Sequence, residues 1–226
     1  MIYWGLLKRK ETLVLSWRGR LLLLLISIAA LFITARYVHP FLAMSRPTYG
    51  EILVVEGWMP DSVLEQAVSF FNKHDYQLII SSGGPLIRGS YLSEYSTYAE
   101  LTAASLRQLG VNQSVIVPVP APPVRTDRTF ASALAVSDWL SKSNTPITSL
   151  DVLSMGAHAR RTQWLFQKAL GDNISVGVIA ATHPEYDPNK WWASSSGVRT
   201  LIGESIAYLY ARFLFDPQES EVSSHF

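Results

Sequence analysis

Four apolar residues in succession, Ile52-Leu53-Val54-Val55, stand directly before Glu56-Gly57. A strand that is apolar at every position is buried on both of its faces. Such strands are typical of parallel sheets whose two faces are covered by helices. This short run therefore predicts an α/β fold with a central parallel strand.

The residues after this strand predict a helix packed on the sheet. Pro60 and Asp61 end the strand, and Ser62 with Glu65 has the spacing of a capping box. Behind this start, apolar residues recur at helical spacing at Leu64, Ala67, Val68 and Phe71. A strand followed by an amphipathic helix is the repeating unit of parallel α/β folds.

The alternation of strands and helices continues along the chain. Further strands are predicted at 78–80, 115–117, 150–153 and 176–179, and helices at 94–109, at 127–141 and up to Gly171. After the third strand, regular pairing is expected to be prevented by Pro118, Pro120, Pro122 and Pro123. A last helix has on one face Val198, Leu201, Ile202, Ile206, Leu209 and Phe213. We therefore expect a three-layer α/β sandwich with a mostly parallel five-stranded sheet.

The composition allows one sizeable core and argues against several functions. Of the 226 residues, 48% are apolar and only 16% are charged, which fits a single domain with an appendage. The net charge of +1 gives no large positive field that would attract nucleic acid. The chain has no cysteine, which excludes a disulfide framework, a thiolate metal site and a thiol nucleophile.

The N-terminal fifth has the character of a membrane anchor. An uninterrupted apolar run covers 21–35, and it extends to Val38 if Arg36 snorkels, which is close to the length of a membrane span. Five basic residues precede the run, namely Lys8, Arg9, Lys10, Arg18 and Arg20, against Arg36 and Arg46 after it. This asymmetry favours a cytoplasmic N-terminus and an α/β domain outside the cytoplasm. A signal peptide cleaved after Ala35 is the alternative.

The chain accordingly divides into five segments. They are a basic segment at 1–20, a single-pass anchor at 21–38, a linker at 39–50, the α/β domain at 51–215 and a polar tail at 216–226. In open parallel sheets, ligands bind beyond the carboxyl ends of the strands. The residues that come after each predicted strand are therefore the candidates for a functional site.

Unusual residues follow each of the first three predicted strands. Glu56 follows the first strand, and Gly83-Gly84 follows the second, where the backbone can approach an oxyanion closely or simply make a turn. After the third strand, a predicted helix start holds Arg125, Asp127, Arg128 and Thr129. Arginines at a helix start suit a phosphate or carboxylate, whereas capping by Thr126 or Asp127 is the structural alternative.

The fourth strand end carries a histidine and two arginines. His158 is expected to be neutral at a helix start and so able to accept or donate a proton. Arg160 and Arg161 would hold an anionic group beside it, unless the segment is only a basic surface turn. Glu204, in the last helix, needs a partner such as Arg161 if it faces inward.

Other patterns give weaker signals. Trp191-Trp192 would line an apolar or sugar-binding wall, rest on lipid or cover the core. No metal site is predicted, because the histidines lack HxxxH or HxH spacing. The G-x-S-x-G motif is absent and no serine or lysine has a marked partner base, which disfavours covalent catalysis.

These motifs resemble the bacterial DUF218 family, also called the YdcF-like family, which includes the envelope factors SanA and ElyC. The matching stretches are Ile52 to Gly57, Ser82-Gly83-Gly84, Glu100 to Val111, Arg128-Thr129, His158 to Arg161, and Glu204, and together they cover about 51–215. The resemblance implies a Rossmann-like α/β fold, N-terminal membrane segments and a role in the cell envelope. It also implies that the family's functional positions fall on Gly83, Gly84, Thr129, His158, Arg161 and Glu204.

The sequence departs from the family pattern at two places. It has Glu56-Gly57-Trp58 where many relatives end the first strand with glycines. Three residues after Thr129 it has Ser132, where the family usually has an asparagine. Because of these two departures, the resemblance does not imply that the chain shares a nucleotide specificity with the family.

Residues and resemblance together predict a membrane-anchored envelope protein that binds an anionic, phosphate-bearing small molecule or a lipid-linked sugar. If it is an enzyme, we expect a hydrolase or a transferase in which His158, with Glu56 and Glu204, carries out the acid–base chemistry. One alternative is a non-enzymatic, membrane-tethered scaffold for a protein of the cell-wall machinery. Another is a protein that binds S-adenosylmethionine or a nucleotide, although Glu56 is too close to the first strand to hold ribose hydroxyls comfortably. No cofactor is assigned.

Overall fold

The structure, a computed structural model, describes residues 14–87, 89–143 and 146–217. The predicted basic segment and the polar tail lie partly outside the described residues, at 1–13 and 218–226. The chain forms two compact units, Met1–Tyr37 and Val38–Phe226.

The first unit contains most of helix α1 (Trp17–Leu42), whose last turn belongs to the second unit. Among the described residues, α1 is the one helix long and apolar enough to cross a membrane. It begins four residues before the predicted span and ends four residues after it. Among the described residues, the apolar side chains from Leu21 to Ile33 are exposed on all sides of the helix, and a helix that is apolar all round is typical of a membrane span.

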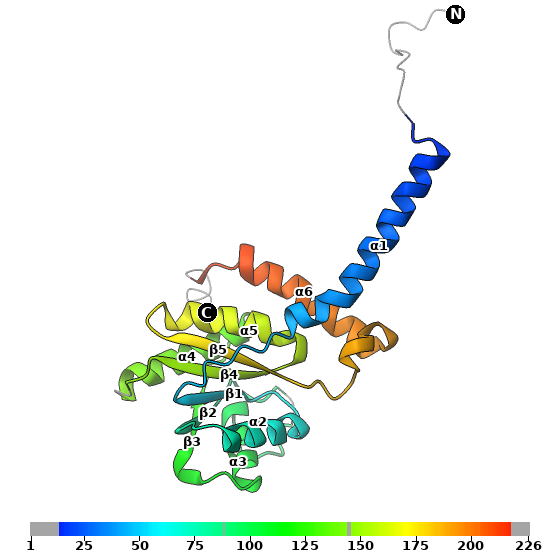
Figure 1. The fold of residues 1–226 in the computed structure, drawn as a ribbon. Helices are drawn as coiled ribbons and strands as arrows, with labels where there is room; N and C mark the ends of the chain where they lie inside the picture. The colour runs from blue at the N-terminus through cyan, green and yellow to red at the C-terminus, as the bar shows by residue number, and fades with distance from the viewer. Residues whose placement is uncertain (1–13, 88, 144–145, 218–226) are drawn as a thin grey trace, which may run out of the picture. The chain divides into compact units, whose positions relative to one another are not determined.

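The second unit is a five-stranded, all-parallel sheet covered by helices, which confirms the predicted α/β fold (Figure 1). The strands are β1 (Ile52–Glu56), β2 (Leu78–Gly83), β3 (Ile116–Pro120), β4 (Ser149–Met155) and β5 (Ser175–Ala181). Their order across the sheet is β3-β2-β1-β4-β5. The order reverses between β1 and β4, and such a switch point is where open parallel sheets bind ligands.

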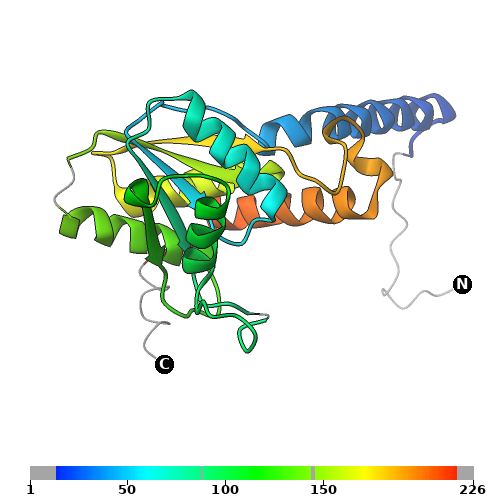
Figure 2. The ribbon, with the colours of Figure 1, turned by 90° about the horizontal axis from the view of Figure 1, so that it is seen from below.

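Two helices cover each face of the sheet. Helices α2 (Asp61–Lys73) and α3 (Tyr98–Gln108) pack on one face around Leu53, Leu64 and Leu106, and they lie in front of the sheet in Figure 2. Helices α4 (Arg128–Ser143) and α5 (Ala159–Leu170) pack on the other face around Val54 and Phe166. The two faces of β1 thus enter different cores, which is why all of its residues are apolar up to Glu56.

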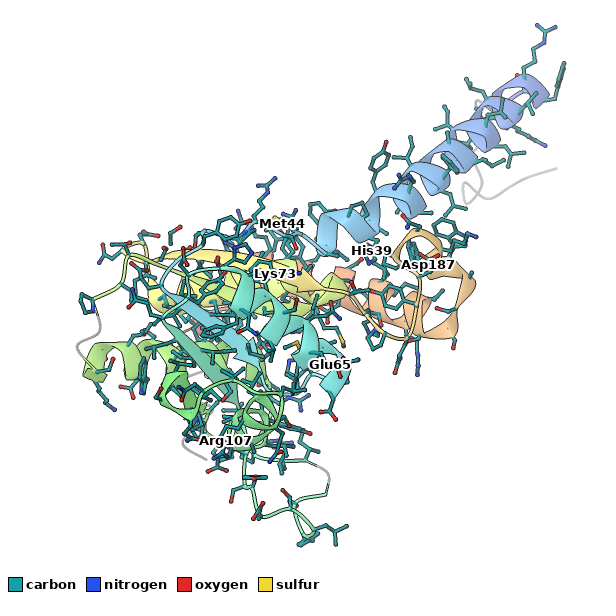
Figure 3. All side chains as sticks on the ribbon, turned by 60° about the horizontal axis from the view of Figure 1, so that its bottom comes forward. His39, Met44, Glu65, Lys73, Arg107 and Asp187 are labelled. Atoms are coloured by element: carbon teal, nitrogen blue, oxygen red, sulfur yellow. The ribbon has the colours of Figure 1, made fainter. Side chains whose placement is uncertain are left out.

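The remaining elements are short 3₁₀ turns and one long helix. The turns are η1 (Gln113–Val115), η2 (Gly156–His158) and η3 (Pro188–Ala193), and the helix is α6 (Ser195–Phe213). Charged side chains such as Glu65 and Arg107 lie on the outer sides of α2 and α3 (Figure 3).

Two sequence predictions about helix starts were wrong. Helix α2 begins at Asp61 after Pro60, with no capping hydrogen bond from a side chain, so the Ser62–Glu65 box does not form. A capping box forms instead at α3, where Thr97 accepts from the amide of Glu100 and Glu100 accepts from that of Thr97. Helix α3 therefore begins at Tyr98 rather than at Glu94.

The expectation that prolines end the pairing of the third strand was also wrong. Pro118 and Pro120 stand opposite Ser81 and Gly83 in the ladder between β2 and β3. Ala121 donates its amide to the carbonyl of Gly83 at 3.1 Å, so the donors of β3 fall on alternate residues. The prolines occupy the intervening positions of an edge strand, where a missing N–H leaves no gap.

The predicted linker at 39–50 is part of the folded unit. Arg46 exchanges both backbone hydrogen bonds with Val178 of β5, at 2.7 and 3.1 Å, and so covers that edge of the sheet. The fully buried carboxylate of Asp151 accepts from the amides of Thr48 and Tyr49 and from the hydroxyl of Tyr76. The segment after α1 is thereby fastened to the sheet.

Candidate functional site

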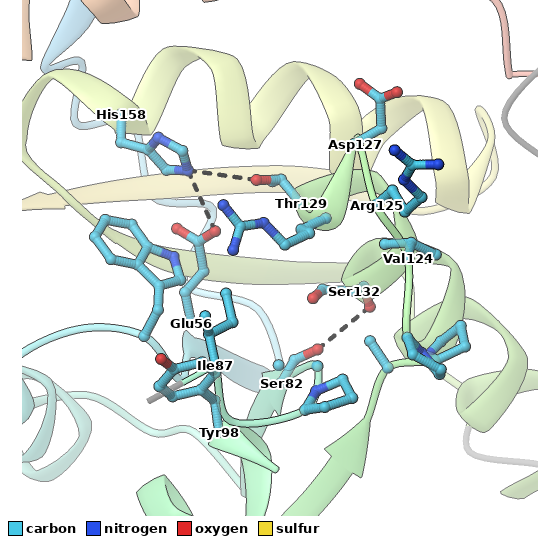
Figure 4. A pocket seen from close by; sticks show the side chains of 18 of the residues that line it. Glu56, Ser82, Ile87, Tyr98, Val124, Arg125, Asp127, Thr129, Ser132 and His158 are labelled. Carbon is cyan, nitrogen blue, oxygen red and sulfur yellow. Dashed lines mark hydrogen bonds and ion pairs between the residues drawn. The ribbon is translucent and has the colours of Figure 1, made fainter. Parts of the chain in front are cut away.

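A cavity of about 910 Å³ opens at the carboxyl end of the sheet, at the switch between β1 and β4. Ten of the eleven predicted site residues line it, namely Glu56, Gly83, Gly84, Arg125, Asp127, Arg128, Thr129, His158, Arg161 and Glu204. Figure 4 shows several of them around one hollow. Residues far apart in the sequence thus meet because parallel strands end at the same edge.

His158 is the most connected side chain of this cavity. It is 8% exposed, and η2 holds it at the start of α5. Its Nδ1 lies 2.9 Å from Oε1 of Glu204, and its Nε2 lies 3.5 Å from both Oε1 of Glu56 and Oγ1 of Thr129 (Figure 4). The indole of Trp58 meets the imidazole edge to face, with 5.1 Å between ring centroids.

The two carboxylates make the imidazole basic. Burial alone would lower the pKa of His158, but the charge of Glu56 and the hydrogen bond to Glu204 outweigh it and raise the pKa to about 9. The expectation of a neutral histidine was therefore wrong at neutral pH. It rested on the helix start, whose effect is smaller than that of two nearby carboxylates.

Glu56 is held as a buried anion at the end of β1. It is 3% exposed, and the hydroxyls of Ser154 and Thr162 donate to its Oε2, the second at 3.3 Å. Burial would raise the pKa of Glu56, but the charge of His158 and these donors lower it. With its oxygens engaged in this way, Glu56 is a partner of His158 rather than a free ligand group.

Arg161 and Glu204 form the outer part of the cluster. The guanidinium donates through Nε to Oε2 of Glu204 at 2.9 Å and through Nη2 to Oε1 at 3.1 Å. Burial opposes ionisation of Glu204, but the hydrogen bond and charge of His158, followed by those of Arg161, lower its pKa to about 2. Nη2 of Arg161 also lies 2.9 Å from Nδ1 of His158, which is a hydrogen bond only when that nitrogen is unprotonated.

The two glycines at the end of β2 differ in the space that the structure leaves for a side chain. A Cβ on Gly83 would lie 2.8 Å from Cβ of Tyr98, so this position admits no side chain without a shift of α3. A Cβ on Gly84 would lie 3.7 Å from the nearest atom, the carbonyl oxygen of Pro122, which is ordinary contact. Within the described residues, the amide of Gly84 has no protein acceptor, so it is available to a ligand.

The start of α4 presents cations and backbone amides to the same cavity. Asp127 has a left-handed backbone, with φ of 52°, and its carbonyl accepts the first helical hydrogen bond, from Ala131 at 3.0 Å. Among the hydrogen bonds of the described residues, none joins the side chain of Thr126 or Asp127 to an amide of the first turn. The amides of this turn therefore remain for a ligand, next to the exposed guanidiniums of Arg125 and Arg128.

Arg160 is the predicted site residue that does not line the cavity. Its guanidinium lies 3.9 Å from the ring centroid of Phe41 and donates to the carbonyl of that residue. Arg160 therefore fixes the last turn of α1 to α5 and is not in position to hold a ligand beside His158. Trp191 and Trp192 lie in η3 and do not line the cavity either.

Several residues of the site were not predicted. The cavity is also lined by Trp58, Ser82, Leu86, Ile87, Tyr98, Pro122, Pro123, Val124, Ser132, Ala207 and Tyr210. Ser154 and Thr162 were missed as donors to Glu56, although Ser154 is the last residue but one of β4 and Thr162 lies one helical turn after His158. A smaller cavity of about 270 Å³ shares Trp58, His158 and Glu204 with the first and adds His183 and Arg199. Among the described residues, no group of three or more His, Asp or Glu is placed to hold a metal ion.

Comparison with known proteins adds no assignment. No model of a known protein family matches the chain, and no curated protein matches it. A functional assignment for this chain therefore depends on the geometry of the cavity.

Proposed function

We propose that this protein binds a phosphate-bearing molecule in the cavity at the switch point and transforms it by acid–base chemistry. The observation that carries the proposal is the cluster of His158, Arg161, Glu204 and Glu56 at one side of the cavity that the α4 start also lines. The cluster supplies a proton donor, and the α4 start supplies donors for an anion.

Anion binding is assigned to the α4 start and the end of β2. Gly84, Arg128 and Thr129 line the cavity, and no protein acceptor for their amides is found among the described residues. The dipole of α4 adds a partial positive charge at its start. Arg125 and Arg128 add guanidiniums that bind phosphate oxygens in pairs. Both arginines are exposed, so they are available to meet a ligand from solvent.

Proton transfer is assigned to His158. With a pKa of about 9, the imidazole is charged at neutral pH and acts as a general acid through Nε2. In hydrolysis or transfer of a phosphate ester, the leaving oxygen takes this proton as its bond to phosphorus breaks. The attacking water or alcohol then returns a proton to the imidazole. Glu204 orients the ring from its Nδ1 side, and Arg161 holds the carboxylate of Glu204 in place.

The apolar part of the cavity favours a lipid-linked or otherwise amphiphilic substrate. Leu86, Ile87, Pro122 and Val124 line the cavity together with the polar cluster. Ligand sites of this kind combine apolar walls with a few polar groups that fix orientation. A polyprenyl-phosphate sugar has both an apolar chain and a phosphate, so it matches this lining better than a free nucleotide does.

We further propose that α1 is a retained anchor with its N-terminus in the cytoplasm, and that the chain is a divergent DUF218-type envelope protein. The excess of basic residues before the span supports the orientation. The positions that carry the resemblance, among them Thr129, His158 and Glu204, line one cavity. Alkaline phosphatase fused after residue 226 would be active in a bacterial host with this orientation and inactive with the opposite one.

Binding to purified full-length protein in detergent tests the substrate class. Inorganic pyrophosphate, a short-chain polyprenyl phosphate, a nucleoside diphosphate and S-adenosylmethionine are compared by quenching of tryptophan fluorescence, because Trp58 contacts His158. We expect the polyprenyl phosphate to bind most tightly. Preference for S-adenosylmethionine or for the nucleotide would contradict the proposed substrate class.

Matched arginine variants locate the binding. Replacing both Arg125 and Arg128 by alanine removes two exposed guanidiniums from the cavity and is expected to weaken binding about tenfold or more. Arg160→Ala is the control, because Arg160 lies on the adjacent helix α5 but contacts Phe41 instead of the cavity. Equal losses in both variants would show that binding occurs elsewhere.

A further inference from the structure

Helix α6 exposes an apolar stripe instead of burying it. Ile202, Ile206, Leu209 and Phe213 are 54%, 64%, 53% and 73% exposed. Their spacing places them along one side of the helix, so they form a continuous strip about 16 Å long. An apolar stripe on a helix normally faces the core, and its exposure here calls for an occupant.

The other side of α6 already packs on the domain. Leu201 is 1% exposed and Ala211 is 3% exposed, and each belongs to a buried apolar cluster. Glu204 points inward to His158 and Arg161. A rotation that buried the strip would therefore expose two core residues and separate the ion pair of the site.

The charges on α6 suit a lipid surface. Glu204 is the one acidic residue between Ser195 and Phe213, and it is paired within the domain. Arg199 and Arg212 are exposed on the same helix. An apolar face with basic residues beside it and no exposed acid is the composition of helices that lie in the membrane interface.

The strip belongs to a helix that is joined to the end of the candidate membrane span. In the folded unit, Leu42 and Leu201 share one buried cluster, against which Tyr208 packs. The rings of Phe41 and Tyr208 meet edge to face, with 5.7 Å between centroids. Phe41 stands four positions after Tyr37 in the sequence, so α6 contacts the chain directly after the first unit.

We propose that α6 lies along the surface of the same bilayer that α1 enters, with Ile202, Ile206, Leu209 and Phe213 buried among the lipid headgroups and upper acyl chains. This contact is separate from the membrane span and does not depend on the proposed chemistry. Ala207 and Tyr210 of α6 also line the main cavity, so one wall of the cavity would lie at the lipid surface. A lipid-linked ligand would then reach the site without leaving the membrane.

Single cysteines test this contact directly, because the natural chain has none. Ile206→Cys and Phe213→Cys are each labelled with a nitroxide in the full chain, which is reconstituted into liposomes that contain anionic lipid. Collision rates with oxygen and with a water-soluble nickel complex are measured by electron paramagnetic resonance. Both labels are expected to show high oxygen and low nickel accessibility, the pattern of a lipid environment.

Two further labels serve as references. Leu25→Cys lies in the apolar run of α1 and marks the bilayer interior, and Lys73→Cys lies exposed on α2 and marks water. High nickel accessibility at 206 and 213 would overturn the proposal, as would low accessibility to both reagents, which indicates cover by α1 or by a second copy. A water-exposed label at 25 would overturn the anchor itself, and ligand binding by the cavity is measured independently of all four labels.

Discussion

Nδ1 of His158 lies 2.9 Å from Oε1 of Glu204, although 46 positions separate the two residues in the sequence. The contact joins η2, the turn after β4, to the middle of α6, and Arg161 of α5 donates two hydrogen bonds to the same carboxylate. An imidazole fixed through Nδ1 by a carboxylate presents Nε2 in one orientation, as a general acid requires.

Removing the negative charge of Glu204 is expected to make His158 less basic. In Glu204→Gln, the amide occupies the same space but no longer stabilises the imidazolium, so the pKa of His158 falls below its value of about 9. A loss of roughly one unit or more is expected. Titration of the histidine carbon-bound protons by NMR measures it, with His158→Gln used to assign the signal. An unchanged pKa would show that Glu204 does not act on the ring.

The stability of the protein should fall on the alkaline side because of the same ring. The pKa of His158 rises from 6.5 in the unfolded chain to about 9 in the folded one, so the folded state binds more protons between these values. Its contribution is complete below about pH 6.5 and is lost as the pH rises through about 9, with an upper limit on the order of 3 kcal/mol.

Urea unfolding of the full chain in detergent, followed by near-ultraviolet circular dichroism, measures this contribution. The difference in unfolding free energy between the natural protein and His158→Gln is expected to shrink between pH 6.5 and pH 9. Glu204 has the opposite dependence, because its lowered pKa of about 2 makes its contribution disappear only in acid, from about pH 4.5 downward. A difference that grows with alkaline pH would refute the charged imidazole.

The adjacent glycines Gly83 and Gly84 should respond differently to alanine. In Gly83→Ala the new methyl group meets Cβ of Tyr98 at 2.8 Å, and the resulting overpacking is expected to cost about 1–3 kcal/mol. In Gly84→Ala the nearest atom is 3.7 Å away, so the change in stability should stay within about 0.5 kcal/mol. Ligand binding should nevertheless weaken in Gly84→Ala, because the methyl group narrows the cavity beside a free amide. Equal destabilisation in the two variants would contradict this distinction.

The layers and the parallel sheet followed from the sequence because they depend on local periodicity. An all-apolar run such as Ile52 to Val55 indicates by itself that both faces of the strand are buried. The pairing of β3 did not follow, because the sequence does not reveal which alternate amides face the neighbouring strand. Pro118 and Pro120 are acceptable only because they fall on the positions that donate nothing to β2.

The sequence was also enough to predict the location of the candidate site, but not the charge state of its residues. Strand ends meet at one edge in any parallel sheet, and this rule was enough to bring Glu56, Thr129 and His158 together. Sequence pattern alone could not choose between Arg160 and Arg161, which leave a helix about 100° apart. The basicity of His158 depends on two carboxylates contributed by β1 and α6, which only the folded chain brings to the ring.

The buried carboxylate of Asp151 should be essential for stability. In the middle of β4 it is fully buried and accepts the amide of Thr48 at 2.7 Å, the amide of Tyr49 at 2.9 Å and the hydroxyl of Tyr76 at 2.6 Å. In Asp151→Asn, one acceptor oxygen becomes an NH₂ group that faces existing donors, which leaves donors unsatisfied and is expected to cost about 2–4 kcal/mol.

Because Asp151 fastens the segment after α1 to the sheet, its loss should release that segment before the core unfolds. Amides such as that of Thr48 should then exchange with deuterium faster in Asp151→Asn than in the natural protein, as hydrogen-exchange mass spectrometry would detect. Asp138→Asn is the matched control, since Asp138 is exposed and pairs with the exposed Lys142 one turn later, and it should change stability by less than about 0.5 kcal/mol. The idea fails if the control destabilises the protein as much as Asp151→Asn does. The loss of stability would then reflect the change in net charge and not the buried acceptor. The segment after α1 would in that case be held by other contacts, such as those of Arg46 with Val178.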